Sequence, residues 1–142
     1  MPPVTTIPST PTPADVEEGT FRLDLEWTCK HLRQLYDYRE LTDADIGRCF
    51  LSSLCFGLYI KGKQIGFARI VTDRAIFSTV AEIVIDYDYR NKGYGMQLLL
   101  AALDHPWVAG TTCVACSRRA PKLFEIAGFK KVHDWVGQRM PK

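Results

Sequence analysis

A glycine-bearing turn between an apolar run and an amphipathic segment constrains this chain more than any other feature. Residues 80–85 (Val-Ala-Glu-Ile-Val-Ile) read as a strand, residues 90–95 (Arg-Asn-Lys-Gly-Tyr-Gly) follow, and apolar residues then recur at helical spacing up to Leu103. This order builds an anion site, because a helix start leaves backbone N–H groups unpaired and carries partial positive charge. The glycines let the backbone approach a phosphate. A plain glycine turn with two surface cations remains the alternative.

The same residues resemble the acyl-CoA signature of the GNAT superfamily of N-acetyltransferases, Arg/Gln-x-x-Gly-x-Gly/Ala. Tyr89 fits the tyrosine that commonly precedes the arginine of that signature. Residues 122–129 (Lys-Leu-Phe-Glu-Ile-Ala-Gly-Phe) resemble the family's Leu-Tyr-x-x-x-Gly-Phe segment, and residues 53–59 and 65–69 read like the hairpin that precedes the signature. The resemblance covers roughly residues 20–136. It implies a GNAT-like fold and acetyl-CoA-dependent chemistry.

The residue patterns predict one α/β domain of the α+β type at residues 15–142, behind a flexible Pro/Thr-rich tail at residues 1–14. We expect a mixed, mostly antiparallel sheet of six to seven strands with about four helices. The segments predicted as helices are 25–36, a segment starting at Thr42, 93–104, and a short one from Pro121; the predicted strands are 21–23, 54–60, 64–71, 80–86, 112–117 and 129–136. Strands 80–86 and 112–117 should form the parallel pair, because a helix connects them.

Composition excludes several classes of function. The chain has 142 residues, of which 46% are apolar, and a net charge of +2 that is too mild to indicate nucleic-acid binding. No apolar run approaches the roughly 20 residues that span a bilayer, so no membrane partner is expected. Five cysteines without a signal peptide favour free thiols and a cytoplasmic location. Cys113 and Cys116 lack a second pair of ligands at a useful spacing, so no metal is predicted.

The resemblance also implies which residues would carry the chemistry. Glu82 would act as the general base, with pairing to a neighbour such as Arg69 as the open alternative. A backbone N–H near Val84 would stabilise the oxyanion of the thioester. Trp27 and Phe124 would line the substrate pocket, although the family often has tyrosine where Phe124 stands. The expected coenzyme contacts are Ile83, Val84, Ile85, Arg90, Asn91, Lys92, Gly93, Tyr94, Gly95, Met96, Ser117 and Arg118.

The leading hypothesis is direct transfer of an acetyl group from acetyl-CoA to a primary amine of a small molecule or a lysine. Two alternatives stay open: a GNAT-fold protein that binds acyl-CoA without turnover, and a repurposed fold that acts on a biosynthetic intermediate. Because Phe124 cannot donate a proton to the departing thiolate, it is the residue on which these hypotheses divide. A homodimer is left open.

Overall fold

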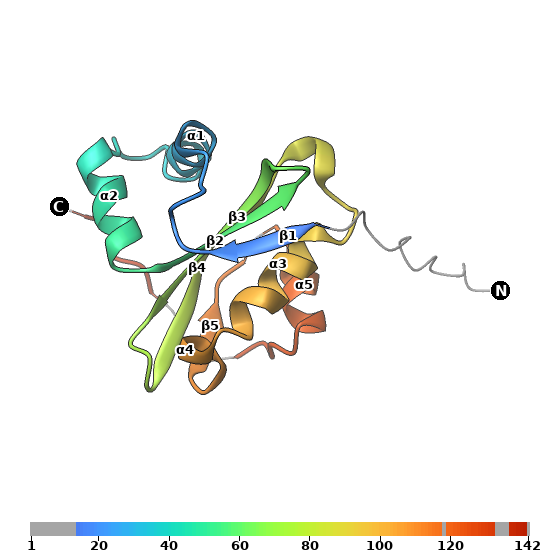
Figure 1. The fold of residues 1–142 in the computed structure, drawn as a ribbon. Coiled ribbons are helices and arrows are strands. Elements are labelled where there is room, and N and C mark those ends of the chain that lie inside the picture. Colours follow the sequence, from blue (N-terminus) through green and yellow to red (C-terminus); the bar gives the residue numbers. More distant parts are fainter. Residues whose placement is uncertain (1–13, 118, 133–136, 142) are drawn as a thin grey trace.

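The computed structural model describes residues 14–117, 119–132 and 137–141. Its elements, shown in Figure 1, follow in the order β1 (Asp15–Glu18), α1 (Leu25–Leu35), α2 (Asp43–Leu51), β2 (Leu54–Ile60), β3 (Lys63–Thr72), β4 (Phe77–Ile85), the 3-10 helix η1 (Tyr87–Tyr89), α3 (Tyr94–Leu103), α4 (Pro106–Ala109), β5 (Thr112–Ala115) and α5 (Pro121–Ile126).

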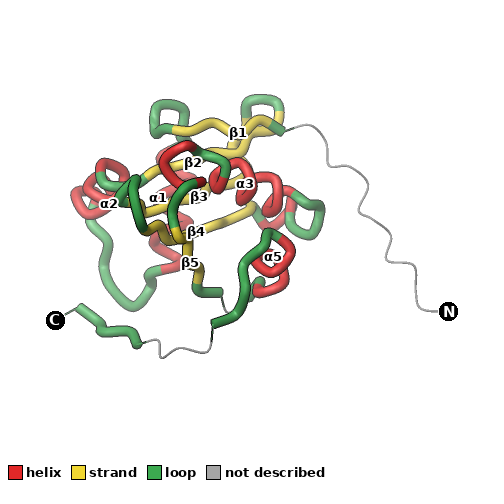
Figure 2. The backbone as a smooth tube through the Cα atoms, turned by 90° about the horizontal axis from the view of Figure 1, so that it is seen from below, coloured by secondary structure: helices red, strands yellow, loops and turns green. Residues whose placement is uncertain are grey.

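One sheet organises these elements. Its strands lie in sequence order, β1 to β5; β1 to β4 are antiparallel to their neighbours, and β5 runs parallel to β4. Helices α1 and α2 cover one face of the sheet, whereas α3 and α5 cover the other (Figures 1 and 2). The predicted parallel pair is therefore confirmed, and α3 is the crossover that such a pair requires.

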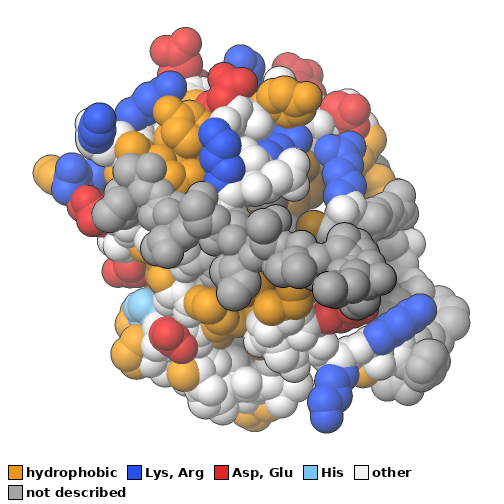
Figure 3. Space-filling view, turned by 90° about the vertical axis from the view of Figure 1, so that its right-hand side faces the viewer, with side chains coloured by type: hydrophobic (Ala, Val, Ile, Leu, Met, Phe, Trp, Pro, Cys, Tyr) orange, Lys and Arg blue, Asp and Glu red, His pale blue; other side chains and the backbone are white. Residues whose placement is uncertain are grey.

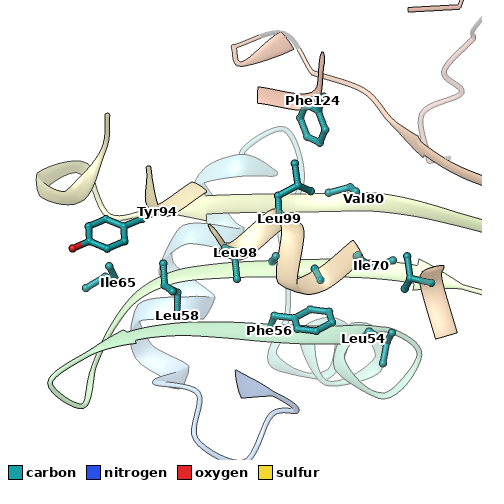
Figure 4. Packing of buried hydrophobic residues seen from close by; sticks show 13 residues of the cluster. Leu54, Phe56, Leu58, Ile65, Ile70, Val80, Tyr94, Leu98, Leu99 and Phe124 are labelled. Atoms are coloured by element: carbon teal, nitrogen blue, oxygen red, sulfur yellow. The ribbon is translucent and has the colours of Figure 1, made fainter. Parts of the chain in front are cut away.

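Each face of the sheet has its own core. On the α3 face, Leu98 and Leu99 are fully buried against strand residues, and Figure 4 shows Leu99 beside Val80 of β4 and near Phe124 of α5. On the α1 and α2 face, a smaller cluster forms around Leu32, Ile46 and Phe67. A second apolar face on the sheet explains why β2 is buried along almost its whole length.

The helix starts follow the sequence cues closely. Asp24 caps α1 by accepting a hydrogen bond from the Trp27 N–H, and Thr42 caps α2 in a reciprocal capping box with Asp45. Pro121 occupies the first turn of α5, and Gly128 follows that helix with a φ of 100°, a left-handed value that favours glycine. These predicted boundaries are confirmed.

The predicted number of strands was wrong, because the described residues form five strands rather than six or seven. The first strand is residues 15–18, not 21–23: Phe21 is 99% exposed in a turn, and Leu23 packs into the α1 and α2 cluster. Residues 129–132 lie outside any strand, and residues 133–136 are outside the described part of the chain. The short helix α4 was not predicted.

The flexible tail at residues 1–14 stays a prediction, because residues 1–13 lie outside the described residues. Ala14 is already part of the domain, since its carbonyl accepts a hydrogen bond from Gln97 of α3 at 2.8 Å and its side chain packs against the core. Within the described residues, no helix is long and apolar enough to cross a membrane. In the view of Figure 3, acidic and basic side chains are both spread over the surface rather than gathered in one patch.

Candidate active site

A β-bulge in β4 creates the opening around which the site forms. Arg69 of β3 pairs with Glu82 and Ile70 pairs with Val80, so Ala81 is an extra residue without a partner on β3. The pairing of β4 with β5 ends at the same point, where Val80 faces Ala115. Because a bulge bends its strand and increases the local twist, β4 diverges from β5 beyond Ala81. The two parallel strands are joined only over residues 77–80 of β4.

The bulge also decides which backbone groups face this opening. The N–H of Asp86 donates to Ile65 of β3 at 2.8 Å, and the carbonyl of Ile85 accepts from Arg90 Nε at 2.9 Å on the opposite side. The backbone N–H and C=O groups of successive residues point to opposite edges of a strand. Those of Glu82 and Val84 therefore point toward β3, whereas those of Ile83 and Ile85 point toward the edge of β4 from which β5 has diverged. Near Val84, the N–H groups that face the opening are therefore those of Ile83 and Ile85, and the oxyanion role of an amide here stays a prediction.

The start of α3 adjoins the end of this open edge. Gly93 is the N-cap with a φ of 88°, and no side chain caps the helix among the described residues. The N–H groups of Tyr94, Gly95 and Met96 are consequently the unpaired donors of the first turn. At position 95, an added Cβ would lie 3.8 Å from both Ile85 and Leu123. Glycine thus keeps a gap where β4, α3 and α5 converge.

Two cations flank the helix start. Arg90 is exposed, and its Nε ties the loop to the Ile85 carbonyl, while its guanidinium lies 5.5 Å from the ring centre of Tyr87. Lys92 is also exposed and donates to the Asp88 carbonyl at 3.2 Å. Asn91 adopts a left-handed φ of 60°, which asparagine tolerates better than most residues. The uncapped amides of α3, the two cations and the open edge of β4 therefore lie next to one another.

The model of the "Acetyltransferase (GNAT) domain" family matches residues 52–131, which include the bulge, the open edge and the start of α3. This chain belongs to the GNAT acetyltransferase family. The match begins just before β2 and ends after α5, so it covers the hairpin, the loop before α3 and the segment around Phe124 that carried the resemblance in sequence.

Solved structures share the GNAT fold over nearly the whole chain. A protein from Xanthomonas campestris assigned to the GNAT acetyltransferases has a TM-score of 0.81 and 25% identity, covering 92% of this chain and 95% of that one. A GNAT protein from Streptococcus pneumoniae has a TM-score of 0.70 at 17% identity, covering 92% and 98%. An aminoglycoside acetyltransferase from a soil metagenomic sample, in complex with sisomicin, has a TM-score of 0.61 at 11% identity, covering 89% and 97%. The last two likenesses concern the fold alone.

A curated relative, the UPF0039 protein of Schizosaccharomyces pombe, is 32% identical over 78 residues. The match covers 52% of this chain and 52% of the relative, so the chain spans about half the length of the curated relative that it matches.

Glu82 of this GNAT domain lies in a buried ion pair. Arg69 donates from Nε and Nη2 to the two carboxylate oxygens of Glu82, both at 2.6 Å, and the Tyr36 hydroxyl donates to the same carboxylate. Only 2% of the Glu82 side chain and 12% of the Arg69 side chain are exposed. The alternative pairing that the sequence left open is therefore present. A general-base role for Glu82 stays a prediction, and it has to operate from within this network.

The network shifts the pKa values of Arg69 and Tyr36. Burial alone would lower the pKa of Arg69, but the hydrogen bonds and charge of Glu82 outweigh it and raise that pKa above its usual range. Burial, and then the hydrogen bond to Glu82, raise the pKa of Tyr36. The Tyr36 hydroxyl thus stays protonated at neutral pH. Arg69 Nη1 also donates to Ser53 at 3.0 Å.

Phe124 and Ser117 lie apart from the open edge. Phe124 is buried, with its ring 5.3 Å from that of Phe129 in an edge-to-face arrangement. Phe124 and Ser117 line a cavity of about 1050 Å³ between β5, α5 and residues 129–132. None of residues 83–85 or 90–96 lines this cavity. Ser117 accepts a hydrogen bond from the Ala120 N–H at 3.0 Å, and Arg118 lies outside the described residues.

Trp27 is half-buried on the α1 and α2 face. Its indole N–H donates to Asp86 at 3.4 Å, and its ring stacks on His31 with a centroid separation of 3.9 Å. Burial acts to raise the pKa of Asp86, but hydrogen bonds from Asp88 and Trp27 and nearby cations outweigh it and lower that pKa. Trp27 therefore contacts the residue that follows β4, which places it beside the open edge rather than in the cavity near Phe124.

Several features of the candidate site were not predicted from the sequence. Nothing in the run 77–85 marks Ala81 as a bulge, and the tie between Arg90 and the end of β4 depends on that strand's direction. The hydrogen bond from the Tyr36 hydroxyl to Glu82 joins residues 46 positions apart, and no local pattern indicates it. In the part of the chain that the structure describes, no three His, Cys, Asp or Glu residues converge on a common point where a metal could bind.

Proposed function

We propose that this GNAT domain transfers the acetyl group of acetyl-CoA to a primary amine, of a small molecule or of a lysine side chain. One observation carries the proposal: the edge of β4 that the Ala81 bulge opens leads directly to the uncapped start of α3. A thioester coenzyme with amide groups in its arm and a diphosphate at its end needs these two features side by side.

The residues present fit this ligand. Outward N–H groups of Ile83 and Ile85 would bind the amides of the arm or the thioester carbonyl, whose developing negative charge fixed N–H donors stabilise. The first-turn N–H groups of α3 and the charges of Arg90 and Lys92 would bind the diphosphate. Tyr94 contributes only its backbone, because its side chain is 3% exposed in the core. Acetyl-CoA would supply the activated acetyl group.

The overall reaction balances without a further reactant. The C–S bond of the thioester breaks, a C–N bond to the amine forms, and the proton lost by the amine ends on the thiol or in solvent. Glu82 is too enclosed to contact an amine directly, so it would accept that proton through the Tyr36 hydroxyl or through water.

Coenzyme binding tests the first half of the proposal. Gly95→Glu and Gly95→Gln add side chains of equal size at the point where β4, α3 and α5 converge, and they differ only in charge. Both should weaken calorimetric binding of CoA, and Gly95→Glu should weaken it about tenfold more, since negative charge would face the diphosphate. Equal affinities for both folded variants and the wild type would refute the coenzyme site.

A second function, coenzyme binding without turnover, is favoured by two specific observations. Arg69 already neutralises Glu82, and Phe124 carries no proton for a departing thiolate. Thiol release from acetyl-CoA over a panel of primary amines separates the two functions. Turnover by the wild type that falls about 10²-fold in Glu82→Gln supports transfer with Glu82 as the base. Coenzyme binding with no thiol release from any amine supports the binding function.

A further inference from the structure

His31 of α1 presents a ring nitrogen that no other group uses in the described part of the chain. Its Nδ1 lies 2.7 Å from the carbonyl oxygen of Trp27, and because a carbonyl only accepts, Nδ1 carries the proton and Nε2 has the lone pair. Stacking on the Trp27 ring fixes the plane of the imidazole. The ring is half-buried, and among the described residues no buried side-chain nitrogen is left without a partner, so Nε2 is open to solvent.

Two contacts fix the position of α1 along β4. Trp27 Nε1 donates to Asp86, the residue that follows β4, and the Tyr36 hydroxyl donates to Glu82. Helix α1 therefore runs antiparallel to β4, because nine residues of helix rise about 13.5 Å and four residues of strand rise about 13 Å. His31 follows Trp27 by four residues, or about 6 Å along α1. It is therefore level with the middle of the section of β4 that lacks β5.

The flank of α1 that carries His31 lies on the side of the opening. Thr28 marks the flank over β3, since its hydroxyl accepts a hydrogen bond from Gln64 of that strand at 3.0 Å. Trp27 instead contacts the residue after β4, and His31 shares the flank of Trp27 because residues four apart on a helix are neighbours. The order across the sheet is β3, β4 and then the edge from which β5 has diverged. His31 is thus on the side of α1 nearer this open edge.

The charges around the imidazole suit a group that gains a proton. Burial acts to raise the pKa of Asp86, but hydrogen bonds from Asp88 and Trp27 and the charges of Lys63 and His31 lower it. Asp86 is therefore within electrostatic range of His31, and its carboxylate would stabilise an imidazolium there, against the opposing charge of Lys63.

A primary amine has two protons to lose on the way to an amide. With a pKa of about 10.4, like that of lysine, it arrives at pH 7 as an ammonium group that has no lone pair for attack. Glu82 is 2% exposed and can reach the amine only through Tyr36 or water. Imidazole is the side chain that ordinarily changes charge near neutral pH, and Nε2 of His31 is accessible.

We propose that His31 is a further catalytic residue, whose Nε2 takes the first proton from the arriving ammonium group. This inference rests on the proposed function, because it names a proton acceptor for that same transfer. The N–H bond breaks toward Nε2, and the amine nitrogen keeps the electron pair with which it attacks the thioester carbon. The second N–H proton then leaves through Tyr36 to Glu82 or to water as the C–S bond breaks. The imidazolium returns its proton to the thiolate or to solvent.

The experiment measures thiol release from acetyl-CoA at pH 7 with two acceptors of the same carbon skeleton. Ethylamine arrives as an ammonium ion, whereas 2,2,2-trifluoroethylamine is mostly neutral because its fluorines withdraw electron density. His31→Gln should lower kcat/KM about 10²-fold for ethylamine and less than about twofold for trifluoroethylamine, which needs no first deprotonation. Glu82→Gln should lower both, since both amines must lose the second proton.

His105→Gln is the matched control, because His105 is also half-buried but caps α4 through Nδ1. It should leave the ratio of the two amines unchanged. Equal losses for both amines in His31→Gln, or no loss for ethylamine, would overturn the inference and leave transfer intact. Thiol release from neither amine by the wild type would refute the proposed transfer, and the inference would fall with it.

Long-range ¹H–¹⁵N NMR of the wild type at pH 8.5 gives a test that does not depend on a folded variant. The inference requires the neutral His31 ring to carry its proton on Nδ1, so that Nε2 is the base. Finding this tautomer supports the inference. A ring protonated on Nε2 would overturn it, because the accessible nitrogen would then be a donor.

Discussion

Removing one partner of the Arg69–Glu82 pair should destabilise this domain far more than removing both. Glu82→Leu would leave a guanidinium whose side chain is only 12% exposed without a counter-charge, and Arg69→Met would do the same to a carboxylate that is 2% exposed. Each single change should cost about 3–5 kcal/mol of unfolding free energy, the usual scale for an uncompensated buried charge. The double variant Arg69→Met/Glu82→Leu replaces the pair by apolar groups of similar size, and it should lose much less than the sum.

Urea unfolding of the four proteins measures this coupling, because the midpoint and slope give each unfolding free energy. The exposed pair of Arg33 and Asp43, with side chains 44% and 96% exposed, is the matched control. Its cycle with Arg33→Met and Asp43→Leu should give a coupling of about 0.2–1 kcal/mol. Additive losses in the Arg69 and Glu82 cycle, within about 0.5 kcal/mol, would show that water reaches the pair and that our argument about its burial is wrong.

Two further changes test the chemistry and the frame of the site. Phe124→Tyr supplies a hydroxyl where the family often has one, and it should raise kcat about tenfold, near 1.4 kcal/mol, if departure of the thiolate limits turnover. An unchanged kcat in a folded variant would show that departure of the thiolate needs no acid. Phe124→Leu controls for the change in packing. Asp73 Oδ1 accepts hydrogen bonds from the N–H groups of Ile76, Phe77 and Ala75 at 2.7–3.0 Å, and these bonds lower its pKa. A carboxylate whose pKa is lower in the folded state stabilises the fold at pH values above its unfolded-state pKa of about 3.9. This stabilisation is lost as the pH falls through the folded-state pKa. Asp73→Asn should therefore flatten the fall of unfolding free energy between about pH 5 and pH 2, and an unchanged slope in urea titrations would contradict this.

The sequence predicts the parts of this domain whose cues are local. Caps such as Thr42 with Asp45 act within four residues, and the glycine turn before α3 requires only that a strand precedes it and a helix follows. β1 was misplaced because its residues, Asp-Val-Glu-Glu, have the composition of an exposed segment. They form a strand because the outer edge of β2 is available to pair with, and that edge is a tertiary feature with no trace in residues 15–18.

The strand count failed for a related reason. Residues 129–132 carry the apolar residues expected of a strand, yet a cavity of about 1050 Å³ separates them from β5. Likewise, β5 ends at Ala115 rather than Ser117, because its partner β4 has turned away after the bulge. Apolar pattern predicts that a segment can join a sheet, but the twist of the neighbouring strand decides where pairing stops.

The single extra residue Ala81 connects these observations into one account of the site. Without it, strand alternation would place Glu82 and Val84 on the same face as Val80, so a carboxylate would enter the larger core beneath α3 and lie away from Arg69. Regular alternation would also direct the backbone N–H and C=O groups of Val84, instead of those of Ile83 and Ile85, toward the edge of β4 from which β5 has diverged. The bulge reverses both assignments at once and ends the pairing with β5 at the same residue. A reading of the sequence that assumes regular alternation therefore places the backbone of Val84 on the wrong side of β4, because one unpaired residue exchanges the two sides of the strand for every residue that follows it.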